Sequence, residues 1–327
     1  MFTKLKIIKA VISTLVISYL ITFSTTGVGQ QNFEDVEVHV LHVQGNIYML
    51  VGAGGNITMQ AGAQGVLIVD TMYAPLSEKV FSAIRSISNK PLTYIINTHA
   101  HSDHIGGNAN LAMMGSNIAG GNTNDVFAAG SGEQAKIVAH ENVVSSILNM
   151  EEDQLALEGW PTDSYYTARK DLFFNGEAIV ISHQVNAHTD GDSLIFFRRS
   201  DVISTGDIYR TTGYPFIDVA SGGTLQGVLN GLNNILDMAV PADRQEGGTM
   251  IIPGHGRLSD EADVLDYRDM LTIIRDRIAY RIDQGDNLVQ VKATEPTYDY
   301  DARYGSDTGF WTTEQFIETI YLELNSQ

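Results

Sequence analysis

A run of histidines directly after an apolar, β-rich segment constrains the fold of this chain more than any other feature. The segment at 92–97 reads LTYIIN, and residues 98–107 read THAHSDHIGG. Alternate residues of an extended segment point to the same side, so His99 and His101 can converge on one metal ion. The turn that follows directs Asp103 and His104 toward a neighbouring ion. The pattern therefore predicts a metal centre at the end of a strand.

Three later motifs supply further ligands, each beside a β-rich run. His188 lies in NAHTDGDS, Asp207 in STGDIYR and His255 in IIPGHG. The chain has no cysteine, which excludes thiolate catalysis, Cys-ligated zinc, iron–sulfur clusters and disulfides. Any metal must therefore be held by His, Asp and Glu. Imidazole together with carboxylate suits zinc and related divalent ions.

Hydrophobic periodicity predicts an α/β chain in which helices cover sheets. Three β-rich runs at 46–52, 57–62 and 65–70 predict an antiparallel meander. Further strands are predicted at 92–97, 178–185, 193–197, 201–205 and 249–253. Helices are predicted from about Leu76, over 225–236 and over 264–278, the last stopping near Gly285. A Gly/Asn/Ala-rich stretch at 115–132 is expected to form a long loop near the histidine motif.

The first 29 residues are predicted to be a secretory signal peptide. Lysines at 4, 6 and 9 precede an apolar run from Ala10 to Phe23, and small residues lead to a cleavage position after Gly29. The alternative is a retained membrane anchor, but the run is short for the ~20 residues that a spanning helix needs. We therefore expect an exported protein, periplasmic or secreted, with no stable membrane anchor after cleavage.

The balance of charge argues against a nucleic-acid partner. The chain has 20 Lys and Arg against 39 Asp and Glu, a formal net charge of −19. Binding to a polyanion depends on clustered Lys and Arg, so a nuclease is disfavoured. The expected partner is a small-molecule substrate, and the sequence leaves the oligomeric state open.

Taken in order, the motifs resemble those of the metallo-β-lactamase fold superfamily. They are HAHSDH, AHTDGDS, TGD and PGHG, with Asp70 of LIVDT matching the first motif of that superfamily. The resemblance covers roughly residues 36–257 and implies an αβ/βα sandwich, with two central sheets flanked by helices and a two-metal site at one edge. The chain then divides into a signal peptide at 1–29, the superfamily domain at 30–258 and a C-terminal helical extension at 259–327 packed on that domain.

The resemblance also implies a role for each motif residue. His99, His101 and His188 resemble the ligands of one zinc ion, Asp103, His104 and His255 those of the second, and Asp207 the bridging carboxylate. Asp103 is also expected to hold or shuttle a proton during catalysis. Asp70 is expected to support the motif loop through hydrogen bonds. The implied cofactor is two Zn²⁺ ions, with iron or manganese as alternatives.

Such a site predicts hydrolysis. Two zinc ions, two carboxylates and a bridging hydroxide leave a net positive charge that stabilises a developing oxyanion. The ions also lower the pKa of bound water toward about 7. We therefore expect a zinc-dependent hydrolase that uses a metal-bridging hydroxide on an ester, thioester, lactone or lactam. The whole chain is most similar to secreted, glyoxalase II-like bacterial hydrolases of this superfamily that are sometimes labelled cyclases.

Two alternative functions stay open. The first is class B-type β-lactamase activity as the main role, which is disfavoured because true zinc β-lactamases have Cys or Ser where this chain has Asp207. The second is a non-hydrolytic iron oxygenase of the persulfide dioxygenase type, or a binding protein that keeps the metals without turnover. The redox branch with an HxExDH motif is disfavoured because His101 takes the place of its Glu.

The remaining candidate residues are interpreted without a chemical role. His39, His42 and His183 are expected to be structural, and His140, between a strand and a helix, to be at most pocket-lining. Tyr209 and Arg210 follow Asp207 and are given no catalytic role. Three glycines at 52, 54 and 55 lack the spacing and context of a dinucleotide site and are expected to form a hairpin turn.

Overall fold

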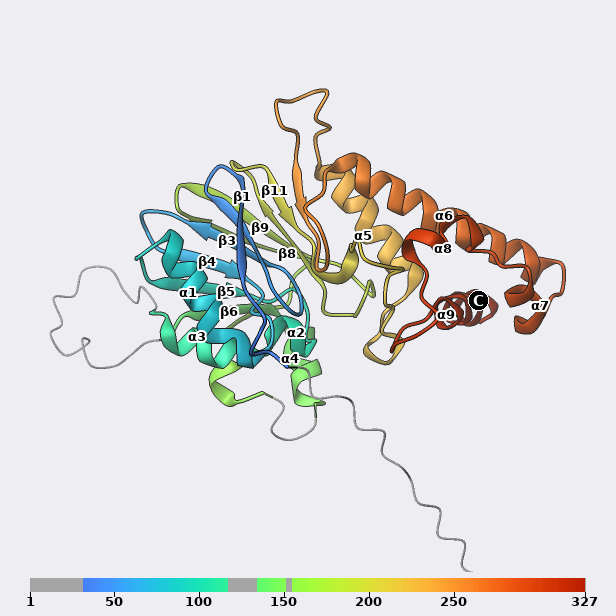
Figure 1. Ribbon diagram of the computed structural model, residues 1–327, viewed down its shortest axis with the longest axis horizontal. Coiled ribbons are helices and arrows are strands. Elements are labelled where there is room, and N and C mark those ends of the chain that lie inside the picture. The colour runs from blue at the N-terminus through green and yellow to red at the C-terminus, as the bar shows by residue number, and fades with distance from the viewer. Residues whose placement is uncertain (1–31, 117–133, 151–154, 327) are drawn as a thin grey trace, which may run out of the picture. The chain divides into compact units, whose positions relative to one another are not determined.

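Two β-sheets organise the fold (Figure 1). The computed structural model describes residues 32–116, 134–150 and 155–326, and the fold begins at Phe33. The first sheet has seven strands in chain order: β1 His39–Gln44, β2 Ile47–Val51, β3 Ile57–Ala61, β4 Val66–Val69, β5 Leu92–Ile96, β6 Lys136–His140 and β7 Asp163–Tyr165. The strands from β1 to β4 are antiparallel neighbours, which confirms the predicted meander. From β4 to β7 they run parallel.

The second sheet has five strands in the order β12-β11-β10-β9-β8. They are β8 Arg169–Phe174, β9 Glu177–His183, β10 Ser193–Phe197, β11 Val202–Ser204 and β12 Met250–Ile252. The strands from β8 to β11 are antiparallel, whereas β11 and β12 are parallel. Both sheets thus contain parallel neighbours whose carboxyl ends lie at one edge, where an α/β fold places its reactive side chains.

Alternation along the buried strands explains why the two sheets face each other. In β4, Leu67 and Val69 point into a core shared with the second sheet, while Val66 and Ile68 point to the opposite face. In β10, Ile195 joins that shared core from the other side. Because successive side chains of a strand point to opposite faces, a strand that is apolar throughout must be covered on both faces.

Helices cover the outer face of each sheet. The first sheet is covered by α1 Ser77–Ile87 and α3 Asn108–Met114, which follow the short helices η1 Ala74–Leu76 and α2 Ser102–Ile105. Beside them lie α4 Glu141–Leu148 and η3 Leu157–Gly159. The second sheet is covered by α5 Leu225–Met238 and α6 Glu261–Asp283, and the short helices η4 Gly206–Ile208 and η5 Val219–Ser221 precede α5. The αβ/βα sandwich expected from the resemblance is therefore confirmed.

The C-terminal helices continue the outer layer of the second sheet. They are α6, α7 Leu288–Ala293, α8 Tyr298–Tyr304 and α9 Thr313–Asn325. Phe316 and Ile320 of α9 share one apolar core with Val228 and Leu232 of α5 and with Ile251 of β12. The helix predicted over 264–278 extends farther at both ends, and Gly285, with a φ of +87°, follows it as the expected stop.

Some predicted elements differ from the structure or fall outside its described part. The strands β1, β7 and β8 have no counterpart among the predicted elements. The predicted signal peptide at 1–29 and nearly all of the predicted loop at 115–132 lie outside the described residues. In the part of the chain that the structure describes, no helix has both the length and the apolar character needed to cross a membrane.

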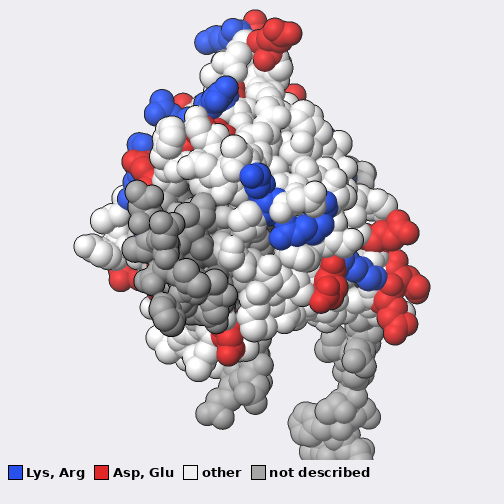
Figure 2. Space-filling view, turned by 90° about the vertical axis from the view of Figure 1, so that its left-hand side faces the viewer, with Lys and Arg blue, Asp and Glu red and all other residues white. Residues whose placement is uncertain are grey.

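The excess of acidic residues does not form one continuous patch on the side shown in Figure 2. Asp and Glu gather there in small groups toward the margins, and a few Lys and Arg lie nearer the middle of a mostly uncharged surface. The acidic residues on this face therefore form separate groups.

Candidate metal centre

All seven predicted ligands lie at one edge of the sandwich, in segments that follow strands. His99, His101, Asp103 and His104 follow β5, and the last two lie in α2. His188 lies in the loop between β9 and β10, Asp207 in η4 after β11, and His255 after β12. The seven residues are separated by up to 156 positions in sequence, yet the structure brings them together in three overlapping groups.

The first group consists of His99, His101 and His188. Each offers a ring nitrogen, and the three nitrogens lie within 4.8 Å of one another. Nε2 of His188 is 2.9 Å from Nδ1 of His101. Two unprotonated ring nitrogens at this distance repel each other unless a proton or a metal ion lies between them.

The second group consists of Asp103, His104 and His255, and Asp207 connects it to the first. Nε2 of His255 lies 3.2 Å from Oδ2 of Asp103 and 3.4 Å from Nε2 of His104. The carboxylate of Asp207 lies 3.2 Å from His104, 3.3 Å from His255 and 4.0 Å from His188. Asp207 therefore lies between the two groups.

Hydrogen bonds fix which nitrogen of His99 carries the proton. The hydroxyl of Thr98 donates its single hydrogen to Oδ2 of Asp70, at 2.8 Å. Its oxygen must therefore accept the hydrogen bond from Nδ1 of His99, at 2.9 Å. Nε2 of a neutral His99 is then left with a free lone pair directed into the site. Support of this kind selects the ligand tautomer of a histidine.

The segment at 216–218 orients the other two histidines of the first group. Nδ1 of His188 donates to the backbone carbonyl of Phe216 at 2.6 Å. Nε2 of His101 donates to Oδ2 of Asp218 at 3.0 Å. Because each outer nitrogen carries the proton, Nε2 of His188 and Nδ1 of His101 are left to face the site. Sequence reasoning missed Phe216 and Asp218, and no motif around them marks this role.

Asp70 makes the hydrogen bonds expected of it. Its Oδ1 accepts from the backbone NH of Thr98, and its Oδ2 accepts from Nδ1 of His104, both at 2.8 Å. Asp70 itself has a φ of +64°, a conformation that Asp and Asn adopt more readily than most residues. The carboxylate thus holds the start of the histidine motif and one ring of the second group.

Two glycines allow the backbone to approach the ligands closely. A Cβ atom at Gly55 would lie 2.3 Å from the ring of His104, and one at Gly254 would lie 2.0 Å from Oδ1 of Asp207. The predicted turn at 52–55 does connect the antiparallel strands β2 and β3. Its position against His104 was not predicted, because sequence spacing does not indicate contacts between distant segments.

Electrostatics favour neutral histidines in the first group. Burial, reinforced by the neighbouring histidines, holds the pKa of His99 well below its usual range. Burial is also the main reason why the pKa of His188 falls to about 4. Metal ligation requires the neutral imidazole, so both rings are in the state that can bind an ion at neutral pH.

The second group is dominated by carboxylates. Burial opposes the charged form of His104, yet Asp207, Asp70 and Asp103 outweigh it and raise its pKa well above the usual value. Burial likewise opposes ionisation of Asp207, but His255 and His104 hold its pKa well below the usual range. The buried carboxylates therefore require a positive charge, which comes from protonated histidine or from a metal ion.

Two unpartnered buried atoms show that these residues fit a bound metal. Within the described residues, Nε2 of His99 and Oδ1 of Asp207 are buried and make no hydrogen bond. Buried polar atoms rarely stay without a partner, so such atoms need an explanation. Both belong to one of the three candidate metal groups. Nitrogen and carboxylate ligands suit zinc, and they also accept iron or manganese.

Among the described residues, the other candidates belong to none of the three candidate metal groups. The rings of His140 and His183 stack on each other, with centroids 3.7 Å apart and an interplanar angle of 4°. Tyr209 is buried and donates a hydrogen bond to Ser259, and Arg210 lines a separate cavity of about 110 Å³. The exposed residues His39 and His42 lie on β1.

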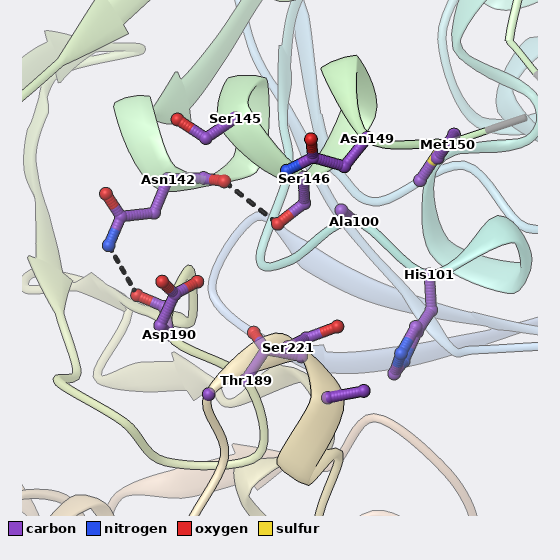
Figure 3. Close-up of a pocket in the computed structure, with 12 residues that line it drawn as sticks. Ala100, His101, Asn142, Ser145, Ser146, Asn149, Met150, Thr189, Asp190 and Ser221 are labelled. Carbon is purple, nitrogen blue, oxygen red and sulfur yellow. Dashed lines mark hydrogen bonds between the residues drawn. The ribbon is translucent and has the colours of Figure 1, made fainter.

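A larger pocket of about 570 Å³ opens beside His101 (Figure 3). Three segments line it: the start of the histidine motif, α4 with the residues after it, and the loops at 189–190 and 220–222. Most of the lining side chains are small and polar, and they include Asn142, Ser145, Ser146 and Thr189. This volume lies in the range of small-molecule sites.

Comparisons with known proteins agree with this arrangement. A stereoselective inverting sec-alkylsulfatase from Pseudomonas sp. has a TM-score of 0.58 at 14% identity, covering 88% of this chain and 50% of that one. A metallo-β-lactamase from Pontibacter korlensis has a TM-score of 0.52 at 12% identity, covering 72% and 99%. The DIM-1 metallo-β-lactamase has a TM-score of 0.51 at 16% identity, covering 73% and 99%. Such identities indicate a shared fold.

The comparisons differ in how much of each protein they cover. The chain spans about half the length of the sec-alkylsulfatase that it matches. A search of curated proteins finds no match. A sequence model described as the metallo-β-lactamase superfamily matches residues 44–256, which contain all seven candidate ligands. The chain therefore belongs to the metallo-β-lactamase superfamily.

Proposed function

We propose that the protein is a zinc-dependent hydrolase that cleaves an ester, thioester, lactone or lactam. Membership of the superfamily supports a metal-dependent hydrolase. The observation that carries the finer proposal is the position of Asp207, whose carboxylate lies between the two histidine groups and within 4.0 Å of three of their rings. One carboxylate shared in this way is suited to two ions rather than one.

The residues of the candidate site are assigned the following roles. His99, His101 and His188 would hold one ion through neutral nitrogens, and Asp103, His104 and His255 would hold the second, with Asp207 between them. When bound, the two ions would supply a nucleophilic water of lowered pKa and polarise the oxygen of the bond to be cleaved. Hydrogen bonds from Asp70, Asp218 and the carbonyl of Phe216 would keep the rings in place.

Asp103 is the residue that we assign to proton transfer. Its carboxyl is one-fifth exposed, whereas that of Asp207 is almost buried. Despite burial, His104 and His255 lower the pKa of Asp103, so its carboxylate is available as an acceptor at neutral pH. It can take a proton as the nucleophile attacks and return it to the leaving group.

Metal analysis and a substrate panel test this proposal together. Protein purified without added metal is expected to contain two zinc ions per chain. A panel of esters, thioesters, lactones, a chromogenic lactam and phosphodiesters is then assayed before and after chelation. A secondary alkyl sulfate belongs in the panel, because a similar structure is named a sec-alkylsulfatase. Activity that disappears with chelator and returns with zinc supports the proposal.

The same experiment separates the alternatives. One iron ion per chain together with oxygen consumption would contradict the hydrolase and support the oxygenase. Lactam turnover far above that of the other substrates would make β-lactamase activity the main role. Asp207→Asn is the diagnostic variant, and it is expected to lose metal and activity. The matched control is Asp237→Asn, which removes the same charge from an exposed position of α5.

We further propose that the protein is exported and acts in the periplasm or after secretion. The basic start and the apolar run before Gly29 support this proposal. Mass spectrometry of protein from cell fractions provides the test. A mature chain that begins at Gln30 is expected outside the cytoplasm, and an intact Met1 on soluble cytoplasmic protein would contradict export.

A further inference from the structure

The pocket beside His101 has a described lining that contains no Lys or Arg. Two helical turns of α4 contribute Asn142, Ser145 and Ser146, and the opposite wall contributes Thr189 and Ser221. A carboxylate, sulfate or phosphate of a substrate would therefore find no Lys or Arg to pair with in this lining.

Asp190 gives the pocket a negative group. In Figure 3 its carboxyl lies across the pocket from His101. A partly buried carboxylate gains most from a ligand that brings a positive charge or a strong hydrogen-bond donor.

The backbone of Asp190 is held by three hydrogen bonds, so its side chain starts from a fixed point of the pocket wall. Its carbonyl accepts hydrogen bonds from Nδ2 of Asn142 at 2.9 Å and from Nε2 of His183 at 2.7 Å. Its NH donates to the carbonyl of Ser221 at 2.9 Å. These contacts involve only the backbone of Asp190, so a change of its side chain leaves them available. Such preorganisation makes a charged group selective.

We propose that this pocket receives a cationic or neutral polar group of the substrate, with Asp190 pairing with an ammonium, and that it discriminates against anions. The proposal rests on the hydrolase function proposed above, because it places this group beside the candidate metal ligand His101. The expected order of reactivity is ammonium-bearing substrate, then the neutral isostere, then the anion. Arg210 does not line this pocket.

Three butyrate esters of similar shape test the order. They are butyrylcholine, its uncharged isostere 3,3-dimethylbutyl butyrate, and the anionic 2-sulfoethyl butyrate. Each kcat/KM of the zinc-loaded protein is divided by the rate constant of the uncatalysed reaction with hydroxide, which removes differences in leaving-group reactivity. We expect a cation-to-neutral ratio of about 10, since a partly exposed charge pair contributes about one factor of ten.

Matched variants identify the residue responsible. Asp190→Asn is expected to bring the cation-to-neutral ratio close to 1. Asp237→Asn removes the same charge far along the sequence on α5, and it is expected to preserve the ratio. Ser145→Lys adds a cation to the pocket wall and is expected to raise the relative rate of the sulfonate ester.

Several outcomes would overturn the proposal. One is a ratio that Asp190→Asn does not change. Another is a preference for the anionic ester in the wild-type protein. If that preference disappears in Arg210→Gln, the charged group binds in the cavity lined by Arg210 instead. The circular dichroism and the melting temperature of each variant show whether it has folded.

A binding measurement separates this proposal from the proposed function. Calorimetry of the zinc-loaded protein compares choline with 3,3-dimethylbutanol, and neither compound needs to react. If no ester is hydrolysed but choline binds more tightly than the alcohol and this difference is lost in Asp190→Asn, the pocket proposal stands and the hydrolase proposal fails. If the esters are hydrolysed at rates that do not depend on their charge, the hydrolase proposal stands and the pocket proposal fails.

Discussion

The carboxylate of Asp218 accepts a hydrogen bond from Nε2 of His101 at 3.0 Å, across a sequence separation of 117 residues. This contact connects the loop after β5 to the loop before α5. It also explains why His101 presents Nδ1, whereas His99 and His188 present Nε2. Asp218 has no place among the motifs of the sequence, yet the orientation of one candidate ligand depends on it.

Removal of the Asp218 carboxylate is expected to weaken metal binding. Asp218→Ala should lower zinc affinity by about 10- to 100-fold, because the supporting partners of a ligating histidine have effects of this size. Asp218→Asn keeps an acceptor oxygen and is expected to lose less zinc affinity than Asp218→Ala. Competition titration with a coloured chelator provides the measurement, and Asp237→Ala is the charge-matched control. Equal affinities of Asp218→Ala and the control would contradict the assigned role.

Asp70→Asn tests the support of the second group. Asn tolerates the left-handed backbone of position 70, so the change removes charge with little backbone strain. The negative partner of His104 is lost, and zinc affinity is expected to fall by about 10- to 100-fold. The decisive measurement is the zinc content after dialysis against graded chelator. A variant that keeps both ions as tightly as the wild type would exclude Asp70 from supporting the site.

Two alanine variants distinguish ligand from neighbour. His101→Ala removes one ligand of the first group and is expected to lose both bound metal and activity. His140→Ala changes a histidine that belongs to none of the candidate metal groups within the described residues, and it should retain metal. Elemental analysis of the two purified variants is sufficient. Loss of a full metal equivalent from His140→Ala would refute the ligand assignment.

His140 is expected to make stability depend on pH. Burial, with a contribution from His183, lowers its pKa from 6.5 to about 4. Between these values the unfolded chain binds a proton here that the folded chain does not, so stability is fully present above pH 6.5 and falls as the pH drops. His140→Asn keeps a good N-cap for α4 but cannot titrate.

Denaturant titrations of metal-free protein from pH 7 to pH 4 provide the test. The free energy of unfolding of His140→Asn should depend less steeply on pH than that of the wild type, by at most one proton. The histidines of the metal centre are common to both proteins, so the difference between the curves isolates position 140. Parallel curves would show that His140 does not contribute.

Trp311 is expected to support the site from a distance. Its Nε1 donates to the carbonyl of Pro215 at 3.0 Å, and its ring packs on that of Phe216, with centroids 5.0 Å apart. Trp311→Ala should therefore loosen the segment that orients His101 and His188, reducing kcat and stability, the latter by about 2 kcal/mol. Trp311→Phe keeps an aromatic ring, so its kcat and stability should fall less than those of Trp311→Ala.

The readouts for Trp311 are zinc affinity, kcat and melting temperature, with Phe173→Ala as the control. Phe173 is an exposed aromatic residue of β8, so its loss tests the general effect of removing a ring. If Trp311→Ala lowers only the melting temperature, its role is confined to packing.

The sequence predicted those parts of the molecule in which a local pattern reflects the structure. The meander from β2 to β4 was predictable because short apolar runs alternate with glycine turns. All seven candidate ligands could be named because each stands beside a strand in a compact motif. The hairpin of β8 and β9 was missed, although Asn175 and Gly176, both with positive φ, form the strongest short signal for such a turn.

The rest depended on contacts that no local pattern encodes. Asp218 and Phe216 support the histidines through hydrogen bonds between distant segments. Gly55 was recognised as part of a turn, but its approach to His104 follows from how β3 and α2 pack. The pocket beside His101 likewise combines three separate stretches of chain. Such features emerge only when the sheets are assembled.

The contact between Trp311 and the segment before α5 bears on where this protein can be shortened. The family match ends at residue 256, yet the indole that holds Pro215 comes from beyond that limit. A chain shortened to the matched region would also expose the apolar faces of α5 that Phe316 and Ile320 cover. A shortened form of this protein, for crystallisation or for a fusion, should keep residues 259–326, because Trp311 holds the segment that orients His101 and His188.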